Sequence, residues 1–120
     1  MTANRRRGEI AAEFDGKPYR LCLTLGALAE LEETYRADDL GALVERFSTG
    51  RLSARDLIRI VGAGLRGAGN AVTDEAVEAM QAPGGAAGFA AIAADLLAVT
   101  FGAGETAAGE GAPAANPSRP

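Results

Sequence analysis

The sequence predicts an α+β fold that is mainly helical: an N-terminal β-hairpin packed on a small bundle of four to five helices, followed by a disordered C-terminal tail. Three observations predict it. Two short runs of alternating apolar residues flank an Asp-Gly pair near the N-terminus. Apolar residues then recur at helical spacing in five segments between residues 25 and 101. From residue 102 onward the chain is mostly Gly, Ala, Pro and Ser, which cannot bury enough apolar surface to fold.

The length of 120 residues suits one domain. We expect that domain to cover residues 8–101. Residues 1–7, which include Arg5, Arg6 and Arg7, are expected to form a flexible basic N-terminus. Residues 102–120 form the predicted tail.

The hairpin is predicted from Asp15 and Gly16, because both positions of a two-residue hairpin turn favour positive φ. The flanking runs are residues 9–14 and 17–25. Pairing Phe14 with Lys17 places five side chains on one face, which we expect to be buried: Ile10, Ala12, Phe14, Tyr19 and Leu21. Glu9, Glu13 and Arg20 then face solvent. Pro18 has no N–H, so its side of the ribbon is predicted to be an unpaired edge.

The helices are predicted from capping residues and apolar stripes. Each of the first four follows a residue whose side chain can accept from the first turn: Thr24, Asp39, Ser53 and Thr73. The predicted helices cover residues 25–36, 40–47, 53–67, 73–80 and 86–101. The second carries the apolar stripe Leu40, Leu43, Val44 and Phe47. The third is apolar on nearly every side, so we expect it at the centre of the core.

Composition excludes several kinds of function. The chain has no histidine and a single cysteine, Cys22, so a zinc site, an internal disulfide and a histidine general base are all absent. We therefore expect no catalysis and no cofactor. The net charge of −4 argues against broad binding to nucleic acid. The sequence also predicts neither a signal peptide nor a membrane helix, so we expect the protein in the cytoplasm.

One glycine pattern has an alternative reading. Gly62, Gly64 and Gly67 match the spacing of a dinucleotide-binding fingerprint. That fingerprint needs a strand before the glycines and a helix after them, whereas Ser53 begins this segment as a helix. Close packing of a helix explains the glycines better, and a dinucleotide-binding protein is kept as a remote alternative.

Residues 6–32, 51–57 and 62–69 resemble a small tail protein of gene transfer agents, which are phage-like particles encoded by bacteria. The most specific stretch is residues 23–32, Leu-Thr-Leu-Gly-Ala-Leu-Ala-Glu-Leu-Glu. The resemblance covers roughly residues 5–102. The family is described both as a tail tube protein and as a tail assembly chaperone. The second description implies that the protein binds the tape measure protein, keeps it soluble while tail tube subunits polymerise around it, and then leaves.

The helix content favours the chaperone, because a tube subunit must present a large sheet that closes into a ring. The alternative is a structural tail tube component of the particle. The residues expected to bind a partner, or a second copy of the chain, are those that the hairpin leaves outward: Pro18, Arg20 and Cys22.

Overall fold

The computed structural model describes residues 3–49 and 51–102 of the chain. Its first elements are a 3₁₀ turn, η1 (Arg5–Arg7), and two strands, β1 (Glu9–Phe14) and β2 (Lys17–Cys22). Five helices follow: α1 (Leu25–Tyr35), α2 (Leu40–Phe47), α3 (Ala54–Gly67), α4 (Asp74–Glu78) and α5 (Gly85–Phe101). The predicted fold class is confirmed. The predicted tail, from residue 103, lies outside the described residues.

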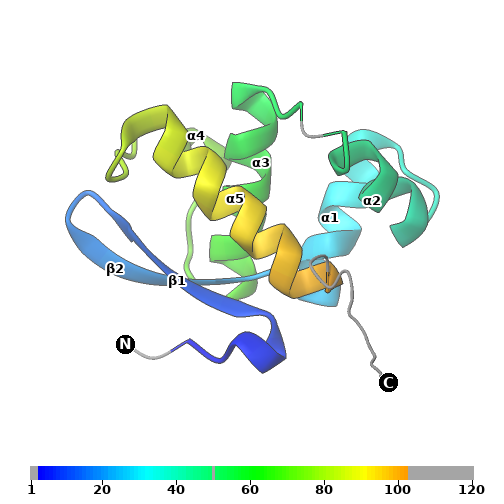
Figure 1. Cartoon of the computed structure of the whole chain (residues 1–120), viewed down its shortest axis with the longest axis horizontal. Helices are drawn as coiled ribbons and strands as arrows, with labels where there is room; N and C mark the ends of the chain where they lie inside the picture. The colour runs from blue at the N-terminus through cyan, green and yellow to red at the C-terminus, as the bar shows by residue number, and fades with distance from the viewer. Residues whose placement is uncertain (1–2, 50, 103–120) are drawn as a thin grey trace, which may run out of the picture.

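Helix α3 is the centre of the arrangement. Strand β2 and helices α1, α4 and α5 all contact it, while α2 reaches the core beside α1. The hairpin lies along one side of the helices, and α5 passes in front of α3 in this view and contacts β1 (Figure 1). The expectation that the third helix is central is therefore confirmed.

The hairpin has the predicted register. Phe14 pairs with Lys17, and the antiparallel ladder continues to Glu9 opposite Cys22. Asp15 and Gly16 both take positive φ, at 56° and 77°, as the two-residue turn requires. Three residues of the predicted inner face are buried and the other two are half-buried: Ile10, Phe14 and Leu21, then Ala12 and Tyr19.

All four predicted caps form. The side chains of Thr24, Asp39, Ser53 and Thr73 each accept a hydrogen bond from a backbone N–H in the first turn of α1, α2, α3 and α4. Such caps contribute about 1 kcal/mol each. Several boundaries differ from the prediction by one or two residues. Helix α1 ends at Tyr35 rather than residue 36, α4 ends at Glu78 rather than residue 80, and α5 begins one residue earlier, at Gly85. The capping residues Ser53 and Thr73 stand just before α3 and α4.

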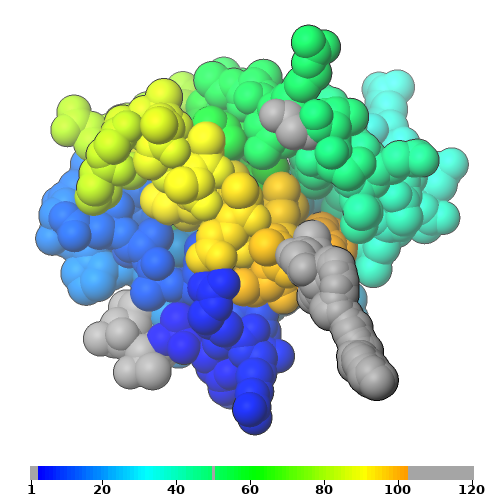
Figure 2. Space-filling model, viewed as in Figure 1, coloured from blue at the N-terminus to red at the C-terminus, as the bar shows by residue number. Residues whose placement is uncertain are grey.

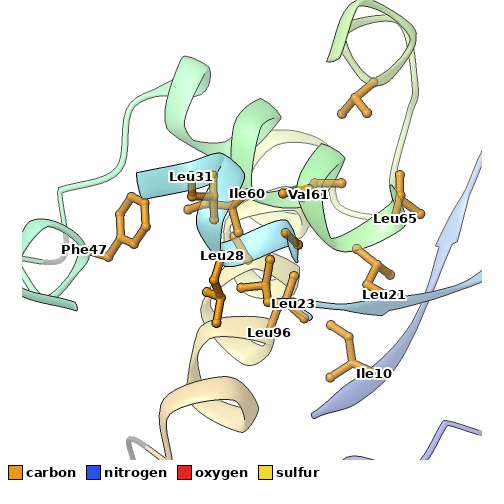
Figure 3. Close-up of a cluster of buried hydrophobic side chains, with 14 of the residues drawn as sticks. Ile10, Leu21, Leu23, Leu28, Leu31, Phe47, Ile60, Val61, Leu65 and Leu96 are labelled. Carbon is orange, nitrogen blue, oxygen red and sulfur yellow. The ribbon is translucent and has the colours of Figure 1, made fainter. Parts of the chain in front are cut away.

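The core is one continuous apolar cluster from the hairpin and all five helices (Figure 3). The labelled members point into a common volume between β1, β2, α1, α3 and α5, with Phe47 entering from α2: Ile10, Leu21, Leu23, Leu28, Leu31, Phe47, Ile60, Val61, Leu65 and Leu96. Each fully buried side chain of this kind contributes roughly 1.5–3 kcal/mol. This cluster holds the hairpin against the helices.

Arg5–Arg7 contact the rest of the chain in this structure, and the expected flexibility of residues 1–7 stays a prediction. These residues form the turn η1, capped by the side chain of Asn4, which accepts from the backbone N–H of Arg6. The guanidinium of Arg5 also makes a two-pronged ion pair with Asp95 of α5, at 2.7 and 2.9 Å. A partner 90 residues away cannot be read from local sequence.

A buried carboxylate joins three helices. Asp56 of α3 is only 3% exposed, and its Oδ1 accepts a hydrogen bond from the Tyr35 hydroxyl at 2.5 Å. Its other oxygen accepts from the backbone N–H of Ser53, which completes a capping box. Arg46 of α2 lies 3.4 Å from the same carboxylate and over the Tyr35 ring, and Arg59 also lies over that ring.

Candidate partner-binding surface

The predicted partner-binding residues lie on one face of β2. Pro18 and Arg20 are exposed and Cys22 is half-buried. Beside Cys22 is a mostly polar hollow of about 460 Å³, lined by residues of η1, β1, β2, α1 and α3. Leu25, the first residue of α1, lies on its rim and is 79% exposed. The three predicted residues therefore border an accessible surface, and their role as a contact stays a prediction.

The outer edge of β2 is covered near Arg20 and Cys22, away from the Pro18 end, where the sequence predicts an unpaired edge. The carbonyl oxygen of Arg20 accepts a hydrogen bond from the Asn70 side chain at 3.0 Å. Beyond it, Gly67 of α3 lies so close to the Cys22 carbonyl that a Cβ at Gly67 would overlap that oxygen. Only the end near Pro18 has no such cover among the described residues, and Pro18 has no N–H to offer.

Cys22 has the surroundings of an unreactive thiol. Its sulfur lies 3.7 Å from the carbonyl oxygen of Arg7. Burial, with help from the charge of Glu9, raises the pKa of this thiol above its ordinary value. A raised pKa keeps the thiol protonated near neutral pH, and a protonated thiol is a poor nucleophile. This geometry supports a packing or contact role for Cys22.

The three glycines of the possible dinucleotide fingerprint lie inside α3, not in a loop between strand and helix. Gly64 lets α3 approach β2 and α5, since a Cβ there would lie 2.6 Å from a methyl of Leu96. Gly62 faces Asp74 and Gly67 faces the Cys22 carbonyl. Close packing accounts for all three glycines, and the helical setting removes the phosphate-binding geometry that a dinucleotide needs.

An apolar groove lies between α2 and the C-terminal end of α5. Five residues line it, and almost all of its accessible lining is apolar: Val44, Phe47, Ser48, Leu97 and Phe101. Figure 2 shows the outer face of α5 in the centre of this view, with α2 beside its C-terminal end. The groove volume is about 110 Å³.

Only half of the predicted apolar stripe of α2 is buried. Its exposed half adds apolar surface beside the groove. Leu43 and Phe47 enter the core, whereas Leu40 and Val44 are 40% and 37% exposed. These two lie at i and i+4, on one line along the helix. Together with Phe101 they give a strip of apolar surface.

A second apolar hollow, of about 170 Å³, lies between the start of α3, α4 and the start of α5. Ile58, Met80 and Phe89 line it and are half-buried. No large apolar side chain is exposed beside it, since the exposed ones are Leu25, Leu40 and Val44. The α2–α5 groove is therefore the better candidate for a protein contact.

The described residues contain neither a metal-binding cluster of side chains nor a helix suited to cross a membrane. Across residues 3–49 and 51–102, no three His, Cys, Asp or Glu side chains gather closely enough to hold a metal ion. In the same part of the chain, no helix has both the length and the apolar character to cross a membrane.

Comparison with known protein families identifies the chain. The family described as "Phage tail tube protein, GTA-gp10" matches residues 7–103. The chain belongs to this family. The resemblance to a gene transfer agent tail protein is thereby confirmed, and membership in this tail tube family implies assembly with other components of a phage-like tail. No curated protein and no solved structure matches the chain.

Proposed function

We propose that this member of the gene transfer agent tail family is a non-catalytic tail assembly chaperone. It acts in the bacterial cytoplasm, where it binds the helical tape measure protein while tail tube subunits assemble. The proposal rests on the small size of the sheet. The described residues hold two strands, whereas stacked tube rings need a broad, continuous β surface.

The α2–α5 groove is the proposed contact with the tape measure protein. An amphipathic helix binds such a groove by inserting apolar side chains at i, i+3 or i+4 and i+7. The exposed pair Leu40 and Val44 continues the apolar lining, so a helix laid here covers both. Residues 103–120 contain no Val, Leu, Ile, Met, Phe, Tyr or Trp, so the chain's own tail has no side chain suited to this groove.

The second candidate function is a structural tail tube component, and the description of the family favours it. In that case the protein remains in the particle at a fixed number of copies. The chaperone and the tube subunit differ in whether the protein is retained, so particle composition separates them.

Substituting Val44 with aspartate will weaken binding to the tape measure protein about tenfold or more, because a charge would be buried without a partner at the centre of the contact. The measurement is a titration of purified tape measure segments with each variant. The fold is expected to persist, since Val44 is 37% exposed in the free protein.

Ala29→Asp is the matched control. It adds the same charge to an exposed position of α1, away from the groove, and should bind like the unsubstituted protein. Equal binding by Val44→Asp and Ala29→Asp would rule out the groove as the contact.

A further inference from the structure

Among the described residues, the outer edge of β1 is open at Ala11 and Glu13. In a two-residue hairpin the residues that close the turn exchange hydrogen bonds, so Phe14, Ala12 and Ile10 point their N–H and C=O groups inward. The groups of Glu9, Ala11 and Glu13 then point outward.

Other contacts confirm this alternation. The outward N–H of Glu9 donates to the Asn4 carbonyl at 3.0 Å, and on the opposite strand the outward carbonyl of Arg20 accepts from Asn70. Ala11 and Glu13 are both exposed. Within the part of the chain that the structure describes, no turn, loop or side-chain group bonds to their backbone N–H or C=O. Two donors and two acceptors are therefore free at consecutive outward positions.

We infer that this edge of β1 pairs with the same edge of a second copy, giving a four-stranded antiparallel sheet across a two-fold axis. In this dimer Ala11 lies opposite Glu13 of the second copy, and Glu13 lies opposite its Ala11. Four backbone hydrogen bonds form, and they use every free donor and acceptor of both edges. An unpaired edge of a two-stranded sheet is a ready template for such pairing.

The charges on the solvent face support the same pairing. Arg20 lies beside Ala11 on β2, so in the dimer Glu13 of the second copy lies on the far side of Ala11. The two Cα atoms are two strand spacings apart, roughly 10 Å. The small side chain of Ala11 leaves the arginine free to extend across it. Arg20 is available for this contact, because its side chain is 46% exposed and its nearest carboxylate, Glu9, is 3.9 Å away.

The other symmetric registers are less favourable. Placing Ala11 opposite its own copy brings Glu13 opposite Glu9, whose N–H is already bonded to Asn4. Placing Glu13 opposite its own copy brings two carboxylates together. Like charges directly opposite each other destabilise a strand pair. Of these registers, the Ala11–Glu13 register pairs the free groups of both residues and keeps Glu13 from lying directly opposite another carboxylate.

A charge swap tests the dimer and its register. Sedimentation velocity over a wide concentration range should show a monomer–dimer equilibrium for the unsubstituted chain. Arg20→Glu and Glu13→Arg alone should each weaken dimerisation about fivefold or more, because each reverses two symmetry-related pairs. The double variant Arg20→Glu with Glu13→Arg should restore it. Glu33→Arg, on the exposed surface of α1, is the charge-matched control and should leave it unchanged.

Amide exchange provides a second readout that does not depend on substitution. The N–H groups of Ala11 and Glu13 should exchange rapidly in dilute solution and slowly at high concentration. The N–H of Ala12, which points into the hairpin, should be protected in both. A monomer at every concentration would overturn the inference. So would a dimer that leaves the Ala11 and Glu13 amides unprotected, or one that the single charge reversals do not weaken.

Discussion

Substituting Asp56 with alanine will lower the free energy of unfolding by about 2–4 kcal/mol, because it leaves buried hydrogen-bond donors without partners. The carboxylate is 3% exposed and accepts from the Tyr35 hydroxyl and the Ser53 backbone N–H. Removing the carboxylate also removes the ion pair that Arg46 of α2 makes with Asp56. Urea denaturation followed by circular dichroism measures the change.

Asp39→Ala is the matched control, since Asp39 caps α2 with one hydrogen bond, to the Ala42 N–H at 2.8 Å, from an exposed position. We expect this substitution to lower the free energy of unfolding by about 1 kcal/mol. If the two substitutions lower the free energy of unfolding equally, the hydrogen bonds of Asp56 contribute no more to stability than an ordinary helix cap.

The same network gives stability a defined pH dependence. Burial alone would raise the pKa of Asp56, but hydrogen bonds from Tyr35 and Ser53 outweigh it and lower the pKa below its ordinary value of 3.8. A lowered pKa in the folded state stabilises the fold at pH values above 3.8, and this stabilisation is lost as the pH falls through the folded-state value. The stability difference between the unsubstituted chain and Asp56→Asn should therefore shrink in acid.

Substituting Gly67 with alanine will destabilise the protein by roughly 1–3 kcal/mol, although alanine is the better helix former. A Cβ at Gly67 would overlap the backbone carbonyl of Cys22, so α3 or β2 must move. A backbone carbonyl held in a strand cannot turn aside as the end of a flexible side chain can.

Gly26→Ala makes the same change in α1, where the nearest atom to the new Cβ is the Thr24 hydroxyl oxygen at 3.9 Å. Here the helix propensity of alanine acts alone, so we expect stability to be unchanged or to rise by up to about 1 kcal/mol. Thermal denaturation of the pair measures both effects. A stabilised Gly67→Ala variant would show that the approach of α3 to β2 is not tight.

The sequence determined most of the local structure because its signals were short-range. Asp15-Gly16 set the turn and therefore the register of the whole hairpin, and four side chains each capped the helix immediately after them. Family membership was also readable from residues 23–32 and their surroundings.

What the sequence could not predict depends on partners far along the chain. The closure of the β2 edge depends on Asn70, 50 residues from Arg20, and the ion pair of Arg5 depends on Asp95. The exposure of Leu40 and Val44 also follows from where α2 docks, which periodicity alone does not give. The sequence indicated an unpaired edge only near Pro18 of β2 and did not indicate the open stretch at Ala11 and Glu13 of β1.

Retention in the particle tests the proposed function most directly. The measurement is quantitative immunoblotting or mass spectrometry of purified gene transfer agent particles beside the lysate of the producing cells. The assembly chaperone proposal predicts the protein in the lysate, together with the tape measure protein, and its absence from finished particles. A fixed, stoichiometric amount in the particles would contradict the proposal and make the protein a structural component of the tail.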